Sequence, residues 1–191
     1  MHIKTLSMLK RTSLLLITAL LFLGTTSFKK EKEAGINWMS IEEAYAAAQK
    51  NPKKVIIDVY TDWCGWCKVM DKKTFTNPEV VKYVNENFYA VKLDAESKQD
   101  ITLGTTTYKY NAQNRANDIA VALLQGKMSF PSMVYLDEEF NMIQPIPGYM
   151  EARAFHEVIT FIGGDYHKSE AFDTYKATTY KDIFKTALVS L

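Results

Sequence analysis

The feature that most limits the possible folds is a short apolar run at residues 55–60, V-I-I-D-V-Y. A loop, two helical segments and a second apolar run at residues 88–93 follow it. The first run is rich in β-branched residues and has Asp58 as its one charged position, which is typical of a buried central strand. Two strands joined through helices form a parallel pair with a right-handed crossover. The sequence therefore predicts an α/β fold.

Helix caps and periodicity predict the remaining elements. Ser40 and Glu43 form a capping box that opens a helix, and Asn77 with Pro78 opens another. Further apolar segments predict two strands, close enough for a hairpin, and two more helices. The strands are expected at residues 132–136 and 142–146, and the helices at residues 114–124 and 151–162. Together these elements give a central mixed four-stranded sheet flanked by helices.

Length and composition fit one domain with additions at both ends. The chain has 191 residues, of which 47% are hydrophobic and 24% charged, the balance of a globular protein. Residues 1–27 combine a basic head, a short apolar stretch and small residues, which is typical of a secretory signal peptide, and a charged leader covers residues 28–35. The domain itself is predicted at residues 36–164, with an insertion at 94–128 and a helical extension at 165–191.

The signal peptide predicts a periplasmic or secreted protein, in a compartment where dithiols can be oxidised. The alternative is that the apolar stretch stays in place as a membrane anchor, so the membrane would be contacted only through an uncleaved segment. The formal net charge of +1 gives no electrostatic footprint for nucleic acid.

The chemistry-bearing motif is C-G-W-C at residues 64–67, placed where a strand ends and a helix begins. The thiolate is the reactive form of cysteine, and the unpaired N–H groups and dipole at a helix N-terminus favour that anion. Cys64 stands at the helix start, so we expect it to be the attacking nucleophile. Cys67 lies one turn inside and is expected to resolve the mixed disulfide that Cys64 forms with a partner.

Around this motif the sequence resembles the thioredoxin superfamily. W-C-G-W-C-K at residues 63–68 has the family's tryptophan before the first cysteine and its lysine after the second. Asp58 matches the family's buried acid, Lys92 its lysine on the neighbouring strand, and F-P-S at residues 130–132 its cis-proline loop. The resemblance covers residues 36–162 and is strongest to secreted bacterial thioredoxin-like proteins. It implies a thioredoxin fold, with the insertion placed before the cis-proline strand.

The resemblance also implies roles for the residues that match. Asp58 would accept the proton of Cys67 through water, and Lys92 would bias the charge of Asp58. The alternatives are a strand-end acid satisfied by a backbone amide, and a lysine that solvates one face. A cis bond at Pro131 would aim the backbone of the preceding residue at the sulfurs and offer a client a strand-like edge. The expected client-binding residues are Trp63, Gly65, Trp66, Phe130 and Pro131.

The predicted function is thiol–disulfide exchange with a protein client that carries a disulfide or thiols, more in the reductive direction. A membrane electron donor would then recycle the site, and no cofactor is expected. The alternatives are a thioredoxin-fold binding module that uses the insertion to hold a client, and a client or metal chaperone. No metal site is expected, because a structural zinc site needs four ligands and the chain has two cysteines and no local pair of histidines.

Overall fold

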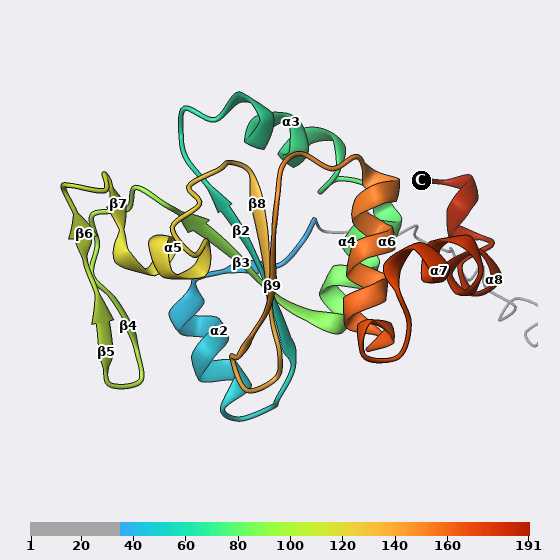
Figure 1. The fold of residues 1–191 in the computed structure, drawn as a ribbon, viewed down its shortest axis with the longest axis horizontal. Helices are drawn as coiled ribbons and strands as arrows, with labels where there is room; N and C mark the ends of the chain where they lie inside the picture. The colour runs from blue at the N-terminus through green and yellow to red at the C-terminus, as the bar shows by residue number, and fades with distance from the viewer. Residues whose placement is uncertain (1–34) are drawn as a thin grey trace, which may run out of the picture. The chain divides into compact units, whose positions relative to one another are not determined.

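A computed structural model describes residues 35–191, in which helices cover both faces of a five-stranded sheet (Figure 1). The predicted signal peptide, at residues 1–27, lies outside the described residues. The strands are arranged in the order β1-β3-β2-β8-β9. β1, β2 and β3 run parallel to one another, β8 is antiparallel to β2, and β9 is antiparallel to β8. Their bounds are Trp38–Met39, Lys54–Tyr60, Phe88–Asp94, Ser132–Leu136 and Met142–Pro147.

The predicted mixed sheet and its β8–β9 hairpin are therefore confirmed, with β1 as an additional strand at one edge. No sequence pattern indicates β1, because a strand of two residues is too short to show any periodicity. β1 is held by parallel pairing with β3, where Trp38 lies opposite Ala90 and Met39 opposite Val91.

Each face of the sheet has its own apolar core, because successive residues of a strand point to opposite faces. On one face, Ile56 and Tyr135 pack against α4 (Pro78–Asn87) and α6 (Ala152–Gly163). On the other, Ile57 and Val134 pack against α2 (Ile41–Ala48) and α5 (Asp118–Leu123). The buried strands β2 and β8 thus lie in the middle of the molecule, and the loops at their ends are held from both sides.

The helix caps lie where the sequence indicates. The Ser40 side chain accepts a hydrogen bond from the Glu43 N–H, and the Glu43 carboxylate accepts one from the Ser40 N–H, so the capping box of α2 is complete. Asn77 caps α4 through its side-chain oxygen, and Pro78 occupies the first turn.

The insertion contains two small hairpins, where the sequence predicts a loop followed by a helix at residues 114–124. Its strands are β4 (Ile101–Leu103), β5 (Thr106–Tyr108), β6 (Tyr110–Asn111) and β7 (Ala116–Asn117). The predicted helix boundary is wrong: α5 begins at Asp118, because Arg115 has a positive φ of 53° and the two residues after it pair with β6. The Asn117 side chain then caps α5 by accepting from the Ile119 N–H.

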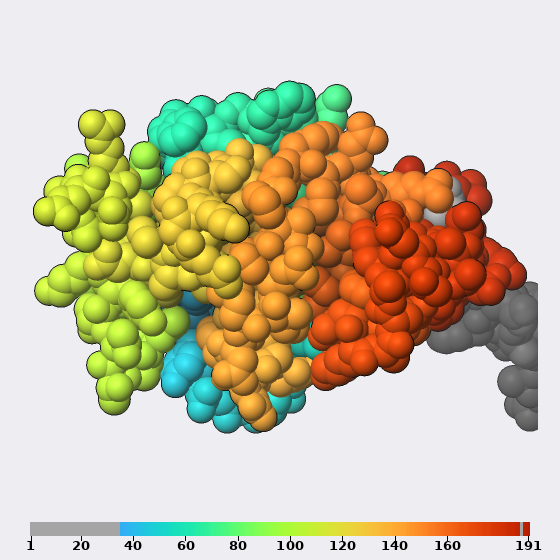
Figure 2. Space-filling view, viewed as in Figure 1, coloured from blue at the N-terminus to red at the C-terminus, as the bar shows by residue number. Residues whose placement is uncertain are grey.

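The C-terminal extension consists of short helices that pack against α6. They are η1 (Tyr166–Lys168), α7 (Phe172–Ala177), α8 (Thr179–Ile183) and η2 (Ala187–Val189). Tyr175 and Tyr180 are fully buried, and Figure 2 shows the red atoms of this segment against the orange atoms of α6. No helix within residues 35–191 is both long and apolar enough to cross a membrane.

Candidate active site

The two cysteines form a disulfide at the start of α3 (Gly65–Lys73), in the loop that leaves the end of β2. Cys64 is the N-cap residue of this helix, and its Sγ accepts a hydrogen bond from the Cys67 N–H at 3.1 Å. The Cys64 N–H in turn donates to the Thr61 carbonyl at 3.1 Å, which fixes the loop. An acceptor at this position satisfies one of the free N–H groups of the first helical turn, so the same N–H favours a thiolate on Cys64 once the disulfide is reduced.

Beneath the disulfide, Asp58 and Lys92 form an ion pair across neighbouring strands. They lie directly opposite each other in the β2–β3 register, and Lys92 Nζ is 2.7 Å from Asp58 Oδ2. Lys92 Nζ also contacts Asp71 Oδ1, on the second turn of α3. The ammonium lies over the ring of Tyr60, 4.9 Å from its centroid, with Trp38 and Phe75 close by. A single ammonium therefore joins two carboxylates within an aromatic cage.

The charge state of this group is set mainly by burial. Asp58 is 1% exposed, and burial raises its pKa above the ordinary value, although the Lys92 charge and hydrogen bond oppose the shift. The nearby Asp71 charge raises the pKa of Asp58 further. Burial acts to lower the pKa of Lys92, but the two carboxylates outweigh it, so that pKa is raised. Asp58 Oδ1 is buried without a hydrogen-bond partner among the described residues.

Aromatic side chains surround the entrance to the disulfide. Trp63 and Trp66 are 65% and 61% exposed, whereas Cys64 and Cys67 are 4% and 3% exposed. The Trp63 ring meets Phe130 edge to face, with centroids 5.9 Å apart, and its indole N–H donates to Glu96 at 3.0 Å. The tryptophans next to the cysteines in sequence are thus exposed, whereas the cysteines themselves are almost fully buried.

Another ring and the loop before β8 add to the surroundings of the cysteine pair. Trp66 packs on Tyr149, with centroids 5.2 Å apart. The Phe130–Pro131 peptide bond is cis, and the Pro131 carbonyl accepts from the Gly148 N–H at 2.8 Å, which ties the loop to the end of β9. Gly65 has no atom within 4 Å of the position that a Cβ would take, so its lack of a side chain leaves open space beside the disulfide.

Sequence reasoning missed three residues that the structure brings to this site: Asp71, Glu96 and Tyr149. Asp71 was open to detection, because it follows Cys67 by four residues and so lies on the same helical face. Glu96 and Tyr149 carry no such signal, since they reach the tryptophans from the insertion and from the turn after β9. Within residues 35–191 no group of three or more His, Cys, Asp or Glu side chains is arranged to hold a metal ion.

Comparison with solved structures shows the thioredoxin fold. A structure titled DsbH oxidoreductase superposes with a TM-score of 0.51 at 17% identity. The aligned region covers 72% of this chain and 90% of the chain in that structure. A thioredoxin-fold protein from Helicobacter pylori gives a TM-score of 0.52 at 21% identity, and covers 77% of this chain and 99% of its own. At these identities the similarity concerns the fold.

The sequence is also similar to part of much longer proteins. The thiol:disulfide interchange protein DsbD of Cronobacter sakazakii is 33% identical over 112 residues, which are 58% of this chain and 17% of that protein. The chain matches 18% of the length of the DsbD protein of Vibrio vulnificus and 8% of that of an uncharacterised protein of Caenorhabditis elegans. A family model described as "Thioredox_DsbH: Protein of unknown function, DUF255" matches residues 21–179, which is most of the chain. With its thioredoxin fold and its cysteine pair at the C-x-x-C spacing, the chain belongs to this DsbH-like thioredoxin family.

Proposed function

We propose that the chain is a thiol–disulfide oxidoreductase that reduces disulfides in protein clients outside the cytoplasm. The observation that carries this proposal is the Cys64–Cys67 disulfide at the N-terminus of α3, with the Cys67 N–H directed at the Cys64 sulfur. The similarity to DsbD, whose name describes thiol:disulfide interchange, supports the same chemistry. The reductive direction is part of the proposal and follows from the resemblance to thioredoxins.

The reaction starts from the reduced dithiol. The Cys64 thiolate attacks one sulfur of the client disulfide, a mixed disulfide forms, and the other client sulfur leaves as a thiolate. The Cys67 thiolate then attacks Cys64 Sγ, which releases the second client sulfur. The client gains two electrons and takes up two protons, and the chain ends as the disulfide seen in the structure. A membrane-bound dithiol donor would return it to the reduced form.

Asp58 is proposed as the proton acceptor for Cys67 in the second step. Its raised pKa brings a carboxylate closer to the range in which it exchanges protons with a thiol, and its Oδ1 is free of protein hydrogen bonds among the described residues. Lys92 is proposed to hold the other oxygen and to set how readily Asp58 ionises.

The exposed rings of Trp63 and Trp66, with the half-buried Phe130 and the neighbouring Pro131, are proposed to dock the client. An unfolded or extended segment presents apolar side chains, and burial of such surface against these rings contributes about 25 cal/mol per Å². Gly65 leaves open space beside the disulfide for that segment.

Reduction of insulin, followed by its turbidity, tests the proposal. The wild-type chain with dithiothreitol as reductant should accelerate precipitation, and Cys64→Ser should give the uncatalysed rate, because the nucleophile is gone. Cys67→Ser should accumulate a mixed disulfide that mass spectrometry identifies. Equal rates for wild type and Cys64→Ser would overturn the proposal.

The two exposed tryptophans also favour a second candidate, a client-binding module without turnover. Such a module would bind an unfolded client equally well with Cys64→Ser, and the wild-type chain would not accelerate insulin reduction. The two measurements on the same pair of proteins therefore separate the candidates.

A further inference from the structure

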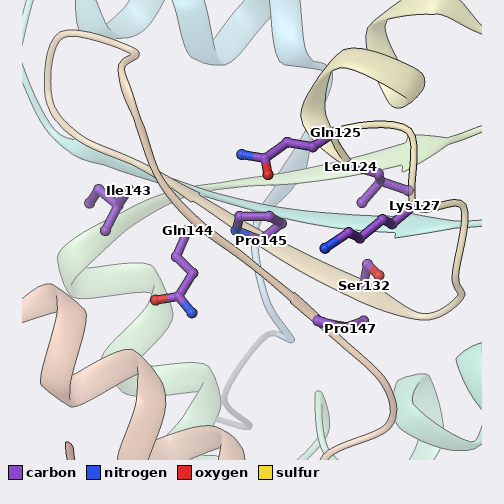
Figure 3. A pocket seen from close by; sticks show the side chains of 8 residues that line it. All are labelled: Leu124, Gln125, Lys127, Ser132, Ile143, Gln144, Pro145 and Pro147. Atoms are coloured by element: carbon purple, nitrogen blue, oxygen red, sulfur yellow. The ribbon is translucent and has the colours of Figure 1, made fainter.

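A pocket lies at the edge of the main sheet, next to the start of β8. It is a pocket of about 380 Å³ between β9 and the segment that leads from α5 to Pro131. Figure 3 shows Gln125 and Lys127 on the side of this segment, and Pro145 and Pro147 on the strand side. The first residue of β8, Ser132, also lines the pocket.

The pocket is electrostatically one-sided. The Lys127 side chain extends over it from the loop (Figure 3), and no carboxylate is among the residues that line it. Within the described part of the chain Lys127 forms no ion pair. Gln125 and Gln144 add amide groups that can donate hydrogen bonds, whereas the Ser132 hydroxyl already donates to the Ser129 carbonyl at 2.7 Å. A positive charge with two neutral amide donors around one hollow is complementary to a carboxylate.

The pocket adjoins the proposed client-binding site along the chain, at the cis-proline loop. Ser132 directly follows Pro131, and Phe130, one residue earlier, meets Trp63 beside the disulfide. Ser132 also lies opposite Pro147 in the β8–β9 register, so both walls of the pocket start at the cis-proline loop. An extended chain advances about 3.3 Å per residue, so a client held at the disulfide reaches this pocket within a few residues.

The strand side of the pocket does not suit the addition of a client strand. β9 is the free edge of the sheet, but Pro145 and Pro147 have no N–H group and interrupt the ladder of donors. A ligand is therefore held here by its side chain rather than by its backbone.

We propose that this pocket is a specificity subsite for an acidic side chain of the client, placed a few residues from the client's cysteine and paired with Lys127. The inference rests on the proposed function for the identity of the ligand as a client. It adds a substrate class, since clients with Asp or Glu near the reactive disulfide are preferred over neutral or basic ones.

The test uses two sets of disulfide peptides that are identical except for one residue. That residue is Glu in one set and Gln in the other, and it is moved through successive positions next to the cysteine. Because an exposed ion pair contributes up to about 1 kcal/mol, we expect the wild-type chain to prefer Glu at one or two positions by roughly fivefold in kcat/KM. The preference should lie in KM and should shrink as salt is raised.

Charge variants identify the pocket as the source. Lys127→Gln should abolish the preference and Lys127→Glu should reverse it, with the rate on the Gln peptides unchanged in Lys127→Gln. Lys181→Glu is the matched control, because it makes the same charge change at an exposed lysine of α8 and should keep the wild-type preference. Equal rates on Glu and Gln peptides at every position, or a preference that survives Lys127→Glu, would overturn the subsite.

A binding measurement separates this inference from the proposed function. Serine-for-cysteine versions of the peptides are titrated into the oxidised, isotope-labelled chain, and amide shifts are followed by NMR. Larger shifts at Lys127 and Ser132 with Glu than with Gln support the subsite even if no peptide is reduced, in which case only the catalytic proposal fails. Equal shifts with the two peptides contradict the subsite even if both are reduced.

Discussion

At the scale of single residues, the group formed by Asp58, Lys92 and Asp71 makes the site sensitive to pH. Lys92 is shared by two carboxylates of different exposure: Asp58 is 1% exposed and Asp71 is 42% exposed. Asp58 has almost no contact with solvent, so its charge depends on Lys92 and Asp71. Asp71 contacts both the solvent and the Lys92 ammonium. Substitutions at these positions should therefore change pH profiles more than they change the fold.

Asp58→Asn should remove a pH dependence of stability. Because burial raises the pKa of native Asp58, the unfolded chain loses this proton first as pH rises above the ordinary value of 3.8, so wild-type stability falls with rising pH through that window. The variant has no such group. We expect the difference between the free energies of unfolding, variant minus wild type, to increase from pH 4 to pH 8. Urea unfolding of the oxidised chains measures it, and a constant difference would contradict the buried-acid assignment.

Asp71→Asn should shift the pH profile of mixed-disulfide release towards lower pH. The Asp71 charge raises the pKa of Asp58, so its removal makes Asp58 easier to ionise. The measurement is the rate at which Cys67 releases a peptide from a preformed mixed disulfide, between pH 4 and pH 9. Asp173→Asn, an exposed acid of α7, is the control and should keep the wild-type profile.

The residues of this site differ in how far they could be predicted from the sequence. The C-x-x-C spacing at a helix start indicated Cys64 and Cys67, whereas Asp58 and Lys92 were expected from the resemblance to thioredoxins, and the structure places these two in contact. The contact between Lys92 and Asp71 depends on how α3 sits over β3. The spacing of Asp71 from Cys67 indicated its face of the helix, but the tertiary partner could not be read from the chain alone.

At the scale of elements, α6 and α8 are joined by a buried histidine. His156 Nδ1 lies 2.9 Å from the Tyr180 hydroxyl, and the histidine is 2% exposed. The rings of Tyr83 and Phe184 contact the same imidazole at centroid distances of 5.7 and 5.2 Å. Burial lowers the pKa of His156 from 6.5 to about 4, so the imidazole is neutral at physiological pH.

This histidine should make the packing of the extension weaken in acid. As the pH drops from 6.5 to 4, the histidine of the unfolded chain binds a proton and that of the native chain does not. The free energy of unfolding therefore decreases over this window, by on the order of 2 kcal/mol. His156→Gln should flatten this part of the pH dependence, although its overall stability is lower. Equal slopes for the two proteins would contradict the assignment.

Elements with strong local signals were predicted well, and those that depend on distant pairing were not. α2 and α4 have complete caps in the sequence, and both begin at the predicted residues. The hairpins of the insertion use strands of two or three residues, whose pairing is fixed by turns such as the positive φ at Arg115. Such turns in non-glycine residues leave little trace in composition, so the helix of the insertion was predicted four residues too early.

At the scale of the whole molecule, the extension completes one of the two cores. Phe161 of α6 meets Phe172 and Tyr175, each at 5.1 Å between centroids, and Tyr175 is fully buried. The extension thus covers apolar surface that the rest of the domain leaves open. The redox site lies on other elements, at the junction of β2 and α3.

Removal of residues 165–191 should therefore destabilise the domain without removing the chemistry. Loss of buried aromatic rings costs about 3–5 kcal/mol for each ring that is truncated in a core, so the loss here should exceed a single substitution of that kind. We expect a lower urea midpoint and new binding of the dye ANS. Thiol–disulfide exchange with a small peptide at low temperature should persist. A truncated chain of wild-type stability would show that the extension does not contribute to the core.

The two edges of the main sheet have a consequence for a protein that meets unfolded chains. One edge strand, β1, has only two residues, and the other, β9, carries Pro145 and Pro147. Short strands and prolines at sheet edges deny a template to a second sheet. Neither edge of the main sheet therefore offers a ready template for β-sheet growth, so the domain resists being drawn into fibrils along these edges.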